Sequence, residues 1–376
     1  MKKITYLCAM LLLSINAMAQ IDLNDDNWEL VIYDDFTGAG RGWHQYNFKE
    51  LTTPTHTEAL WRCFPMGWHC FVFTDDYHHQ VYQPSQSVFT NGTLRLDSRY
   101  TGPNDLSCEN GDFILPYGAD CDTCEPVDKH YLSGMIESLN NDFGFGYYEI
   151  KYKTPVHIDA HAGFWLHGCG PNSYEEIDIM EYSKGDCQHD FMYGYSSGIW
   201  FNPNSLQNPE NIGKTYYHLP TTEPNLGQYH TFGVEWMPEY VKWYRDNEVV
   251  SEYRVRDSIP QYNKRILVTY EIGSYDATIW EGSGALTIDY VKAYRLKTDC
   301  NSDVSIRSVA DWQNYVAKVR RSIAIGSPNG LVVPSGSNLT MRATESITID
   351  QPFELQQGTP MTLIIQECPI NQVSAP

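Results

Sequence analysis

Short runs of β-branched and aromatic residues recur along the chain, and Gly, Pro, Asn or Asp separates one run from the next. Several runs alternate apolar and polar side chains, as a strand with one buried and one solvent-facing side does; residues 148–153, for example, read Tyr-Glu-Ile-Lys-Tyr-Lys. Asp246-Asn247 separates two such runs and predicts a hairpin turn. We therefore expect an all-β antiparallel sandwich with strands over residues 28–33, 93–96, 146–152, 177–180, 230–236, 240–244, 266–272 and 286–294.

The pattern changes after about residue 298, where aromatic residues become rarer and short segments repeat. Ser322-Ile-Ala-Ile325 is echoed by Ser346-Ile-Thr-Ile349, and the segment 338–341 by the segment 361–364. A repeat of this length with alternating apolar positions predicts stacked short strands. We therefore expect a β-sandwich over residues 20–298 and a small β-rich repeat domain over residues 299–376. A helix over residues 309–319, opening at Ser308, is the competing interpretation.

The first nineteen residues have the features of a secretory signal peptide. Two lysines follow Met1, residues 7–15 are mostly apolar, and Ala17-Met18-Ala19 matches a cleavage site. We expect cleavage after Ala19 and a secreted protein. No later run approaches the roughly 18 apolar residues of a transmembrane helix, so we expect no membrane-spanning segment.

Composition narrows the choice of partners. The chain carries 26 Lys+Arg against 47 Asp+Glu, a formal net charge of −21, which opposes nucleic acid as a partner. Its 27 tyrosines and 10 tryptophans suit hydroxyl-rich ligands such as sugars. Of its 10 cysteines, Cys8 lies in the expected leader. The other cysteines are expected to form disulfides, with at least one left unpaired and the connectivity open.

The segment Glu176-Ile-Asp-Ile-Met-Glu181 places three carboxylates within one expected strand. Strict alternation puts Glu176 and Asp178 on one face but turns Glu181 into the core. A buried unpaired carboxylate is costly, so we expect a β-bulge near Ile179-Met180 that returns Glu181 to the face of the other two acids.

Two carboxyl groups about 5–5.5 Å apart are the machinery of a retaining glycosidase, and a third acid between them can keep one neighbour protonated. From spacing alone, a solvated charged face or a calcium-binding edge is an equally good interpretation of the segment.

The acidic hexapeptide resembles the Glu-x-Asp-x-x-Glu signature of glycoside hydrolase family 16, the branch with laminarinases, agarases, porphyranases and carrageenases. Segments at 28–36, 143–151, 163–166, 230–236 and 288–294 are similar to segments of that family in the same order. The resemblance covers roughly residues 27–295. It implies a concanavalin-like β-jelly-roll with a sugar-binding cleft on its concave sheet.

Carried over by position, the resemblance implies Glu176 as nucleophile, Asp178 as assisting acid and Glu181 as general acid/base of a double displacement. It places Trp165 and Tyr174 as stacking platforms for sugars. It implies no cofactor for catalysis. A structural Ca²⁺ would be held at the positions of Asp35, Gly92 and Asp289.

Further aromatic residues are candidates for sugar subsites: Tyr193, Trp200 and Trp280, with Trp236 weighed against a core position. His157 and His161 are four residues apart, as metal ligands on a helix are, but on a strand this spacing separates them, so we expect cleft or surface histidines.

The substrate remains open between a β-1,3-glucan or an agar-like galactan and a sulfated galactan such as porphyran or carrageenan. The net negative charge favours a neutral chain, unless Arg95 or Arg254 forms a basic patch in the cleft. A lectin-like binding module without catalysis is the rival function.

Overall fold

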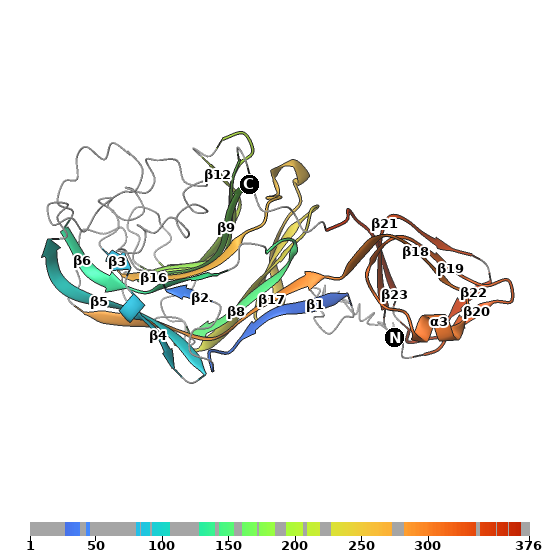
Figure 1. Ribbon diagram of the computed structural model, residues 1–376, viewed down its shortest axis with the longest axis horizontal. Helices are drawn as coiled ribbons and strands as arrows, with labels where there is room; N and C mark the ends of the chain where they lie inside the picture. The colour runs from blue at the N-terminus through green and yellow to red at the C-terminus, as the bar shows by residue number, and fades with distance from the viewer. Residues whose placement is uncertain are drawn as a thin grey trace, which may run out of the picture.

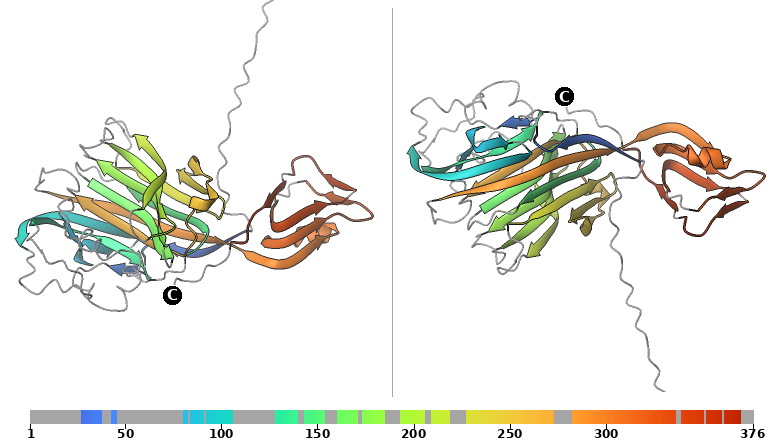
Figure 2. Two further views of the ribbon diagram at one scale, coloured as in Figure 1. Left: turned by 90° about the horizontal axis from the view of Figure 1, so that it is seen from above. Right: turned by 90° about the horizontal axis from the view of Figure 1, so that it is seen from below.

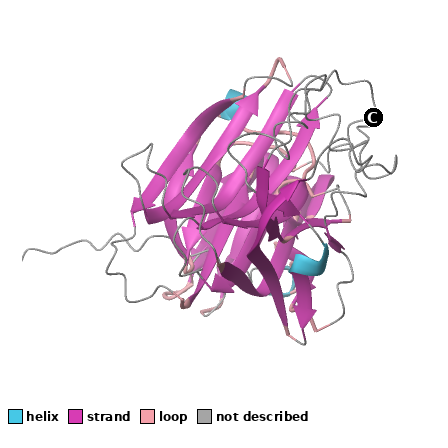
Figure 3. Ribbon diagram, turned by 90° about the vertical axis from the view of Figure 1, so that its left-hand side faces the viewer, coloured by secondary structure: helices cyan, strands magenta, loops and turns pink. Residues whose placement is uncertain are grey.

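The computed structural model describes residues 27–37, 43–45, 80–82, 84–90, 92–105, 128–139, 143–153, 160–170, 173–184, 193–205, 209–218, 227–272, 282–335, 339–350, 352–359 and 361–369. Strands dominate these residues (Figure 3). The expected signal peptide lies outside them. None of the helices in this part of the chain has the length and apolar character that a membrane span requires.

The larger sheet of the sandwich contains ten of the described strands. They are β1 (Trp28–Asp34), β3 (Gln80–Tyr82), β4 (Ser87–Thr90), β5 (Thr93–Asp105), β6 (Asp128–Ser133), β8 (Gly146–Lys153), β13 (Tyr229–Trp236), β14 (Val241–Arg245), β15 (Glu248–Tyr253) and β17 (Ser283–Leu296). The main path is β15-β14-β13-β8-β17-β5-β6-β3, with β1 beside β17 and β4 beside β5. The pairs are antiparallel apart from β3 with β6. Two 3-10 turns, η2 (Pro84–Gln86) and η4 (Arg256–Ser258), flank this sheet.

The second sheet has seven described strands and lies on the inner side of the curve that both sheets follow (Figure 1). They are β2 (Trp43–Gln45), β7 (Met135–Ser138), β9 (Ala160–Gly170), β10 (Ser173–Lys184), β11 (Tyr193–Asn202), β12 (Glu210–His218) and β16 (Arg265–Ile272). Their order is β12-β11-β10-β9-β16-β7-β2. The acidic hexapeptide therefore lies on β10, a central strand.

The core fills the space between the two sheets. Ile150, Phe164, Ile177 and Val291, drawn from both sheets, have no solvent-exposed surface. Each strand expected from the alternation pattern coincides with an observed strand, and most of the predicted strand ends lie within two residues of the observed ones. The all-β sandwich is therefore confirmed. The hairpin is confirmed as well, since Asp246 and Asn247 have φ of 50° and 69°, the left-handed values that a tight turn needs.

Glu149 departs from the expected alternation. It lies on the outer side of β8, where a solvated side chain was expected, yet it is only 3% exposed. The hydroxyls of Tyr147 and Tyr290 each donate a hydrogen bond of 2.8 Å to its carboxylate. Tyrosine rings therefore cover this part of the outer face, and their hydroxyls replace the water that the carboxylate loses.

The chain after β17 forms a separate group of strands at one end of the sandwich (Figures 1 and 2). Four parallel strands follow the order β18 (Thr298–Ile306), β19 (Val319–Ile325), β21 (Leu339–Ile349) and β23 (Met361–Ile365), and β20 (Leu331–Val333) pairs with β22 (Phe353–Leu355). The repeated segments are stacked in register, with Ser322 beside Ser346 and Leu339 beside Met361. This group has a hydrophobic cluster of its own, which includes Trp312.

The competing helix is present in part. Helix α3 (Val309–Gln313) begins after Ser308, whose hydroxyl accepts a hydrogen bond from the Asp311 amide at 3.2 Å. It ends by Asn314, and Val319 already begins the next strand. The helical spacing therefore extends over one turn rather than over residues 309–319.

Several contacts join the C-terminal strands to the sandwich. The buried Asn27 side chain donates a 2.9 Å hydrogen bond to the Thr340 carbonyl, and Val319 belongs to the core cluster of the sandwich.

Within the C-terminal part, a disulfide links Cys300 to Cys368, with the two Cα atoms 5.9 Å apart. This confirms one expected disulfide; the side chains of the other cysteines lie outside the described residues.

Candidate active site

The expected bulge is present in β10. On the β9 side, Asp178 pairs with Trp165 and Met180 with Phe164, so Ile179 is the extra residue. On the β11 side, the register also shifts between Asp178 and Glu181. Ile179 and Met180 are both buried in the core. With two successive side chains turned inward, Glu181 shares with Glu176 and Asp178 the face that points away from the other sheet, which we call the acid face.

Hydrogen bonds from outside the strand satisfy the carbonyls of the bulge. The indole of Trp243, on β14 of the opposite sheet, donates a 2.9 Å hydrogen bond to the Asp178 carbonyl. The Ser197 hydroxyl donates one of 3.1 Å to the Ile179 carbonyl. A bulge releases backbone groups from the regular ladder, and a buried carbonyl without a partner is costly. These two donors therefore hold the kink in place.

Two tryptophans flank the acids on the neighbouring strands. Trp165 on β9 is the register partner of Asp178, and Trp200 on β11 is the register partner of Glu176. Both are half-buried. Because Ala162, Phe164 and Leu166 point into the core, alternation places Trp165 on the acid face. The structure thus brings these two predicted subsite residues to the acids.

Glycines occupy two of the four other positions beside the acids, and His167 and Ser196 occupy the remaining two. Gly163 pairs with Glu181 on β9, and Gly198 pairs with Asp178 on β11. A Cβ atom at Gly163 would lie 2.7 Å from the Thr269 hydroxyl, and one at Gly198 would lie 2.9 Å from the Asn211 side chain. A side chain at either position would therefore displace a neighbouring side chain next to the carboxylates.

Burial raises the pKa of Glu176 to about 7, helped by the charge of Glu181, while hydrogen bonds from Tyr174 and Asp178 act against this rise. The Tyr174 hydroxyl donates to Glu176 Oε2 at 2.5 Å. Burial, together with the charges of both glutamates, raises the pKa of Asp178 well above its ordinary range. These effects favour the protonated form of Asp178, which is the form that can donate a hydrogen bond to Glu176.

Glu181 has a different surrounding. Burial alone would raise its pKa, but the interaction with the nearby His161, the charge of Lys214 and a hydrogen bond from Ser196 lower it below the ordinary value. His161 Nε2 lies 3.8 Å from Glu181 Oε1, and the Ser196 hydroxyl donates to Glu181 Oε2 at 3.2 Å. The three acids therefore differ in their tendency to ionise.

The remaining predicted subsite residues have different outcomes. Tyr174 was expected to stack on a sugar, but its ring is only 2% exposed and its hydroxyl is bound to Glu176, so its position fits a role in orienting that carboxylate. Trp236 is a core residue. The Tyr193 backbone belongs to β11, but its side chain lies outside the described residues, as do Trp280 and His157.

The residues expected to hold calcium have other partners in the structure, and the calcium site stays a prediction. Asp289 Oδ2 lies 2.7 Å from the Lys151 ammonium, so its charge is already balanced. Asp35 Oδ1 accepts hydrogen bonds from the Thr37 amide and hydroxyl. Gly92 contributes its amide to the Phe36 carbonyl at 3.4 Å. Calcium takes six to eight oxygen ligands, and the Lys151 ammonium beside Asp289 opposes binding of a cation at that carboxylate.

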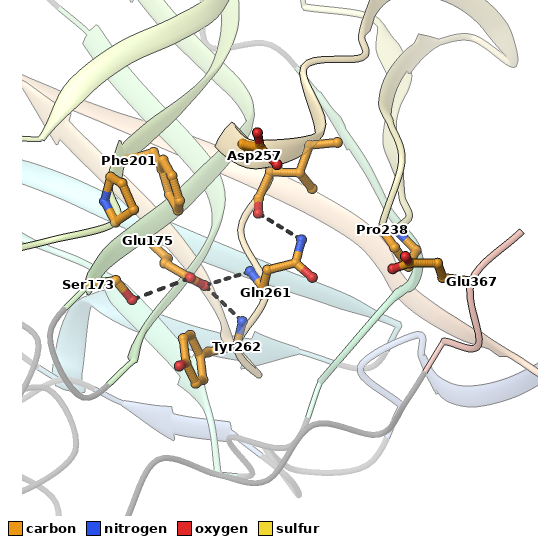
Figure 4. Close-up of a pocket in the computed structure, with 10 residues that line it drawn as sticks. Ser173, Glu175, Phe201, Pro238, Asp257, Gln261, Tyr262 and Glu367 are labelled. Carbon is orange, nitrogen blue, oxygen red and sulfur yellow. Dashed lines mark hydrogen bonds between the residues drawn. The ribbon is translucent and has the colours of Figure 1, made fainter.

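A cavity of about 550 Å³ opens at the start of β10 (Figure 4). By alternation, Glu175 points to the side of the strand opposite to Glu176. Glu175, which lines it, is buried, forms an ion pair with Lys264 and accepts hydrogen bonds from the amides of Gln261 and Tyr262. Its hydrogen-bonding capacity is thus largely used. The cavity is separate from the candidate active site.

The arginines considered as a basic patch belong to the other sheet or its edge. Arg95 on β5 lies between the buried Leu94 and Leu96 and therefore points away from the core, where it pairs with Asp97. Arg254 follows β15 and pairs with Glu252. Neither residue lies on the acid face.

Sequence reasoning missed three contributors to this site. The alternation along β9 would have placed His161 on the acid face, but spacing alone did not show that it meets Glu181. Tyr174 was expected to stack on a sugar and not to donate a hydrogen bond, and Trp243, an aromatic residue in a strand, is interpreted first as packing. Trp243 is also far from the bulge in sequence, so only the folded chain brings the two together.

Comparison with known proteins agrees with this geometry. Residues 75–292 match the family model for glycosyl hydrolases family 16. A β-glucanase of Acetivibrio thermocellus is 27% identical over 214 residues, which cover 54% of this chain and 47% of that protein. A κ-carrageenase of Pseudoalteromonas carrageenovora is 27% identical over 195 residues, 48% of this chain and 46% of that protein. The chain spans about half the length of these curated relatives.

A solved structure described under "Prominent members of the human gut microbiota express endo-acting O-glycanases to initiate mucin breakdown" aligns with a TM-score of 0.51 and 17% sequence identity, covering 72% of this chain and 92% of that chain. This likeness shows a shared fold. The family match extends over more than half of the 376 residues and includes β10 with its three acids. The chain therefore belongs to glycosyl hydrolases family 16.

Proposed function

We propose that this protein is a secreted, endo-acting glycoside hydrolase that cleaves a polysaccharide with retention of anomeric configuration. The observation that carries the proposal is the bulge in β10, which places Glu176, Asp178 and Glu181 on one face between two tryptophans. Family membership supports the reaction class, and the relatives named β-glucanase and κ-carrageenase support a polysaccharide substrate.

In the first step, ionised Glu176 attacks the anomeric carbon of the sugar. The bond from that carbon to the glycosidic oxygen breaks, and Glu181 gives its proton to the departing oxygen. The products of this step are a glycosyl ester on Glu176 and an ionised Glu181.

In the second step, Glu181 takes a proton from a water molecule whose oxygen attacks the same carbon. The ester bond to Glu176 breaks, and Glu176 returns to its ionised form. Two displacements at one carbon restore the original configuration. The reactive state of the free protein therefore has Glu176 ionised and Glu181 protonated.

Asp178 and Tyr174 act on the nucleophile. Both donate hydrogen bonds to Glu176, which stabilises its ionised form and fixes the orientation of the carboxylate. Asp178 can donate because its own pKa is raised by burial and by the two glutamate charges.

We propose a neutral polysaccharide, such as a β-1,3-glucan or an agar-like galactan, as the substrate. The acids give the face a negative potential that opposes a sulfated chain. Arg265, a cation on the same sheet, forms an ion pair of 2.5 Å with the buried Glu137, so its charge is already balanced.

We also propose that residues 1–19 are a cleaved signal peptide, that residues 20–298 form the catalytic sandwich, and that residues 299–376 form an accessory domain. The apolar leader, the separate hydrophobic cluster of the C-terminal strands and the disulfide between Cys300 and Cys368 support this division.

The test is a substrate screen followed by replacement of the nucleophile. Laminarin, mixed-linkage glucan, agarose, porphyran and carrageenans are assayed for release of reducing ends. On the substrate that is cleaved, Glu176→Ser is expected to lower kcat by about three orders of magnitude or more, because the covalent step is lost. Binding of the polysaccharide should persist in this variant.

Glu248→Ser is the matched control, since Glu248 is exposed and lies in a hairpin of the other sheet. It should retain wild-type turnover. Unchanged turnover in Glu176→Ser would exclude Glu176 as nucleophile, and binding without cleavage of any of these chains by the wild type would favour a lectin-like function.

A further inference from the structure

His161 lies beside Glu181 on the acid face. It belongs to β9, where Ala162 next to it points into the core, and its backbone pairs with Ser183 of β10. Its Nε2 atom is 3.8 Å from Glu181 Oε1, and the two side chains are 17% and 26% exposed. The pair is thus partly shielded from solvent, which makes its interaction stronger than that of an exposed pair.

The other charged groups near Glu181 come from β10 and β12. Glu176 and Asp178 lie on the same strand, and Lys214 on β12 acts on Asp178 and Glu181 by its charge. Lys214 is exposed, so solvent screens it more than His161. Glu271 is the register partner of His161 on β16, and its side chain lies outside the described residues.

We propose that His161 is a positioning residue that determines which of two carboxyl groups, Glu176 or Glu181, carries the catalytic proton. The inference rests on the proposed function, because it assigns the proton between the proposed nucleophile and the proposed acid. When the imidazole is charged, it stabilises ionised Glu181 and leaves the proton on Glu176. When the imidazole is neutral, the hydrogen bonds from Tyr174 and Asp178 favour ionised Glu176, and the proton resides on Glu181.

Only the second distribution is reactive. The charge of Glu181 raises the pKa of Glu176, so a protein in which Glu181 is held ionised needs a higher pH to ionise its nucleophile. Histidine ordinarily loses its charge near pH 6.5, within the range where enzymes of this kind would operate. His161 therefore sets the lower end of the active pH range.

The first test is the pH dependence of kcat/KM in His161→Gln, which keeps an N–H donor but has no charge. Glu181 then retains its proton to higher pH, and the neighbouring Glu176, no longer beside an ionised carboxylate, ionises more easily. We expect the acidic limb of the profile to move about one pH unit toward lower pH. A nearby opposite charge shifts a pKa by about one to three units, and this expectation takes the lower value. A merely structural role would lower activity at every pH and leave the limb in place.

The matched control is His230→Gln. His230 also pairs with a carboxylate, with Nδ1 2.7 Å from Asp246 Oδ2, but it lies on the other sheet. Its pH profile should coincide with that of the wild type. An acidic limb that stays in place in folded His161→Gln, or that moves equally in His230→Gln, would overturn the inference.

The second test needs no substrate. The ring resonances of His161 are titrated by NMR in the wild type and in Glu181→Gln. Removing the neighbouring negative charge should lower the pKa of His161 by about one unit. An unchanged pKa would overturn the inference whatever the outcome of the substrate screen. A shift together with no cleavage of any polysaccharide would instead count against the proposed function alone.

Discussion

At the scale of single residues, Glu176 combines features that oppose each other. Its half-buried carboxyl group is largely shielded from water and lies near the charge of Glu181, and both factors raise its pKa to about 7. Tyr174 and Asp178 counteract this with hydrogen bonds. A carboxylate of this kind is reactive because its charge is poorly solvated, and for the same reason it weakens the folded state at neutral pH.

The loss of stability caused by ionised Glu176 should be measurable by comparing wild type with Glu176→Gln. In the unfolded chain Glu176 releases its proton near 4.5, and in the folded chain near 7, so the free energy of unfolding falls as pH rises through this window. Glutamine does not ionise, so the free energy of unfolding of Glu176→Gln does not fall in this way as pH rises. We expect Glu176→Gln to gain about 1–2 kcal/mol over the wild type between pH 4.5 and pH 8, less than the full shift because solvent screens the half-buried group. Urea unfolding at both pH values measures it.

Glu248→Gln, at an exposed position, is the control and should show no such pH-dependent gain. A difference between Glu176→Gln and wild type that is equal at pH 4.5 and pH 8 would contradict the raised pKa.

The placement of the three acids on one face was predictable, because it depends only on the alternation of side chains along one strand. The residues that contact these acids were not predictable. Alternation around Ile177 and Ile179 requires a bulge if Glu181 is to avoid burial, and this argument needs six residues only. The contact of His161 with Glu181 depends on the register between β9 and β10, and sequence does not fix that register.

At the scale of elements, the bulge in β10 depends on a residue of the opposite sheet. Trp243 on β14 reaches through the core to the Asp178 carbonyl, so the two sheets are linked at the point where the acidic strand kinks. The larger sheet thus acts as more than a support for the smaller one, since it helps to fix the position of the acid face.

Trp243→Phe should reveal this link. Loss of the indole N–H leaves the buried Asp178 carbonyl without this donor, which costs about 1–2 kcal/mol of stability. Because the carbonyl belongs to the bulge, we expect kcat to fall about tenfold or more through misplacement of Glu181. Urea unfolding and steady-state kinetics measure the two effects.

Trp236→Phe is a close control, since Trp236 is also buried and its indole donates a 2.9 Å hydrogen bond to a carbonyl, that of Pro260. It should lose similar stability while kcat stays within about twofold of wild type. Equal losses of turnover in both variants would mean that the indole of Trp243 contributes stability only.

At the scale of the whole molecule, the chain combines a sandwich with a stack of parallel strands. Both were predictable from periodicity: alternation gave the sandwich strands, and the repeats around Ser322 and Ser346 turned out to lie side by side. The junction was not predictable. Asn27 and Thr340 meet across it although they lie 313 positions apart in the sequence, and no local pattern signals such a contact.

The proposed roles of Glu176 and Glu181 determine the anomeric configuration of the first product. Proton NMR of the substrate that the screen identifies, recorded within minutes of adding enzyme and before mutarotation, shows the configuration of the new reducing end. If Glu176 and Glu181 act as a retaining pair, a β-linked chain gives the β-anomer first. Initial release of the α-anomer would show inversion by direct attack of water, and would contradict the assignment of Glu176 as a nucleophile.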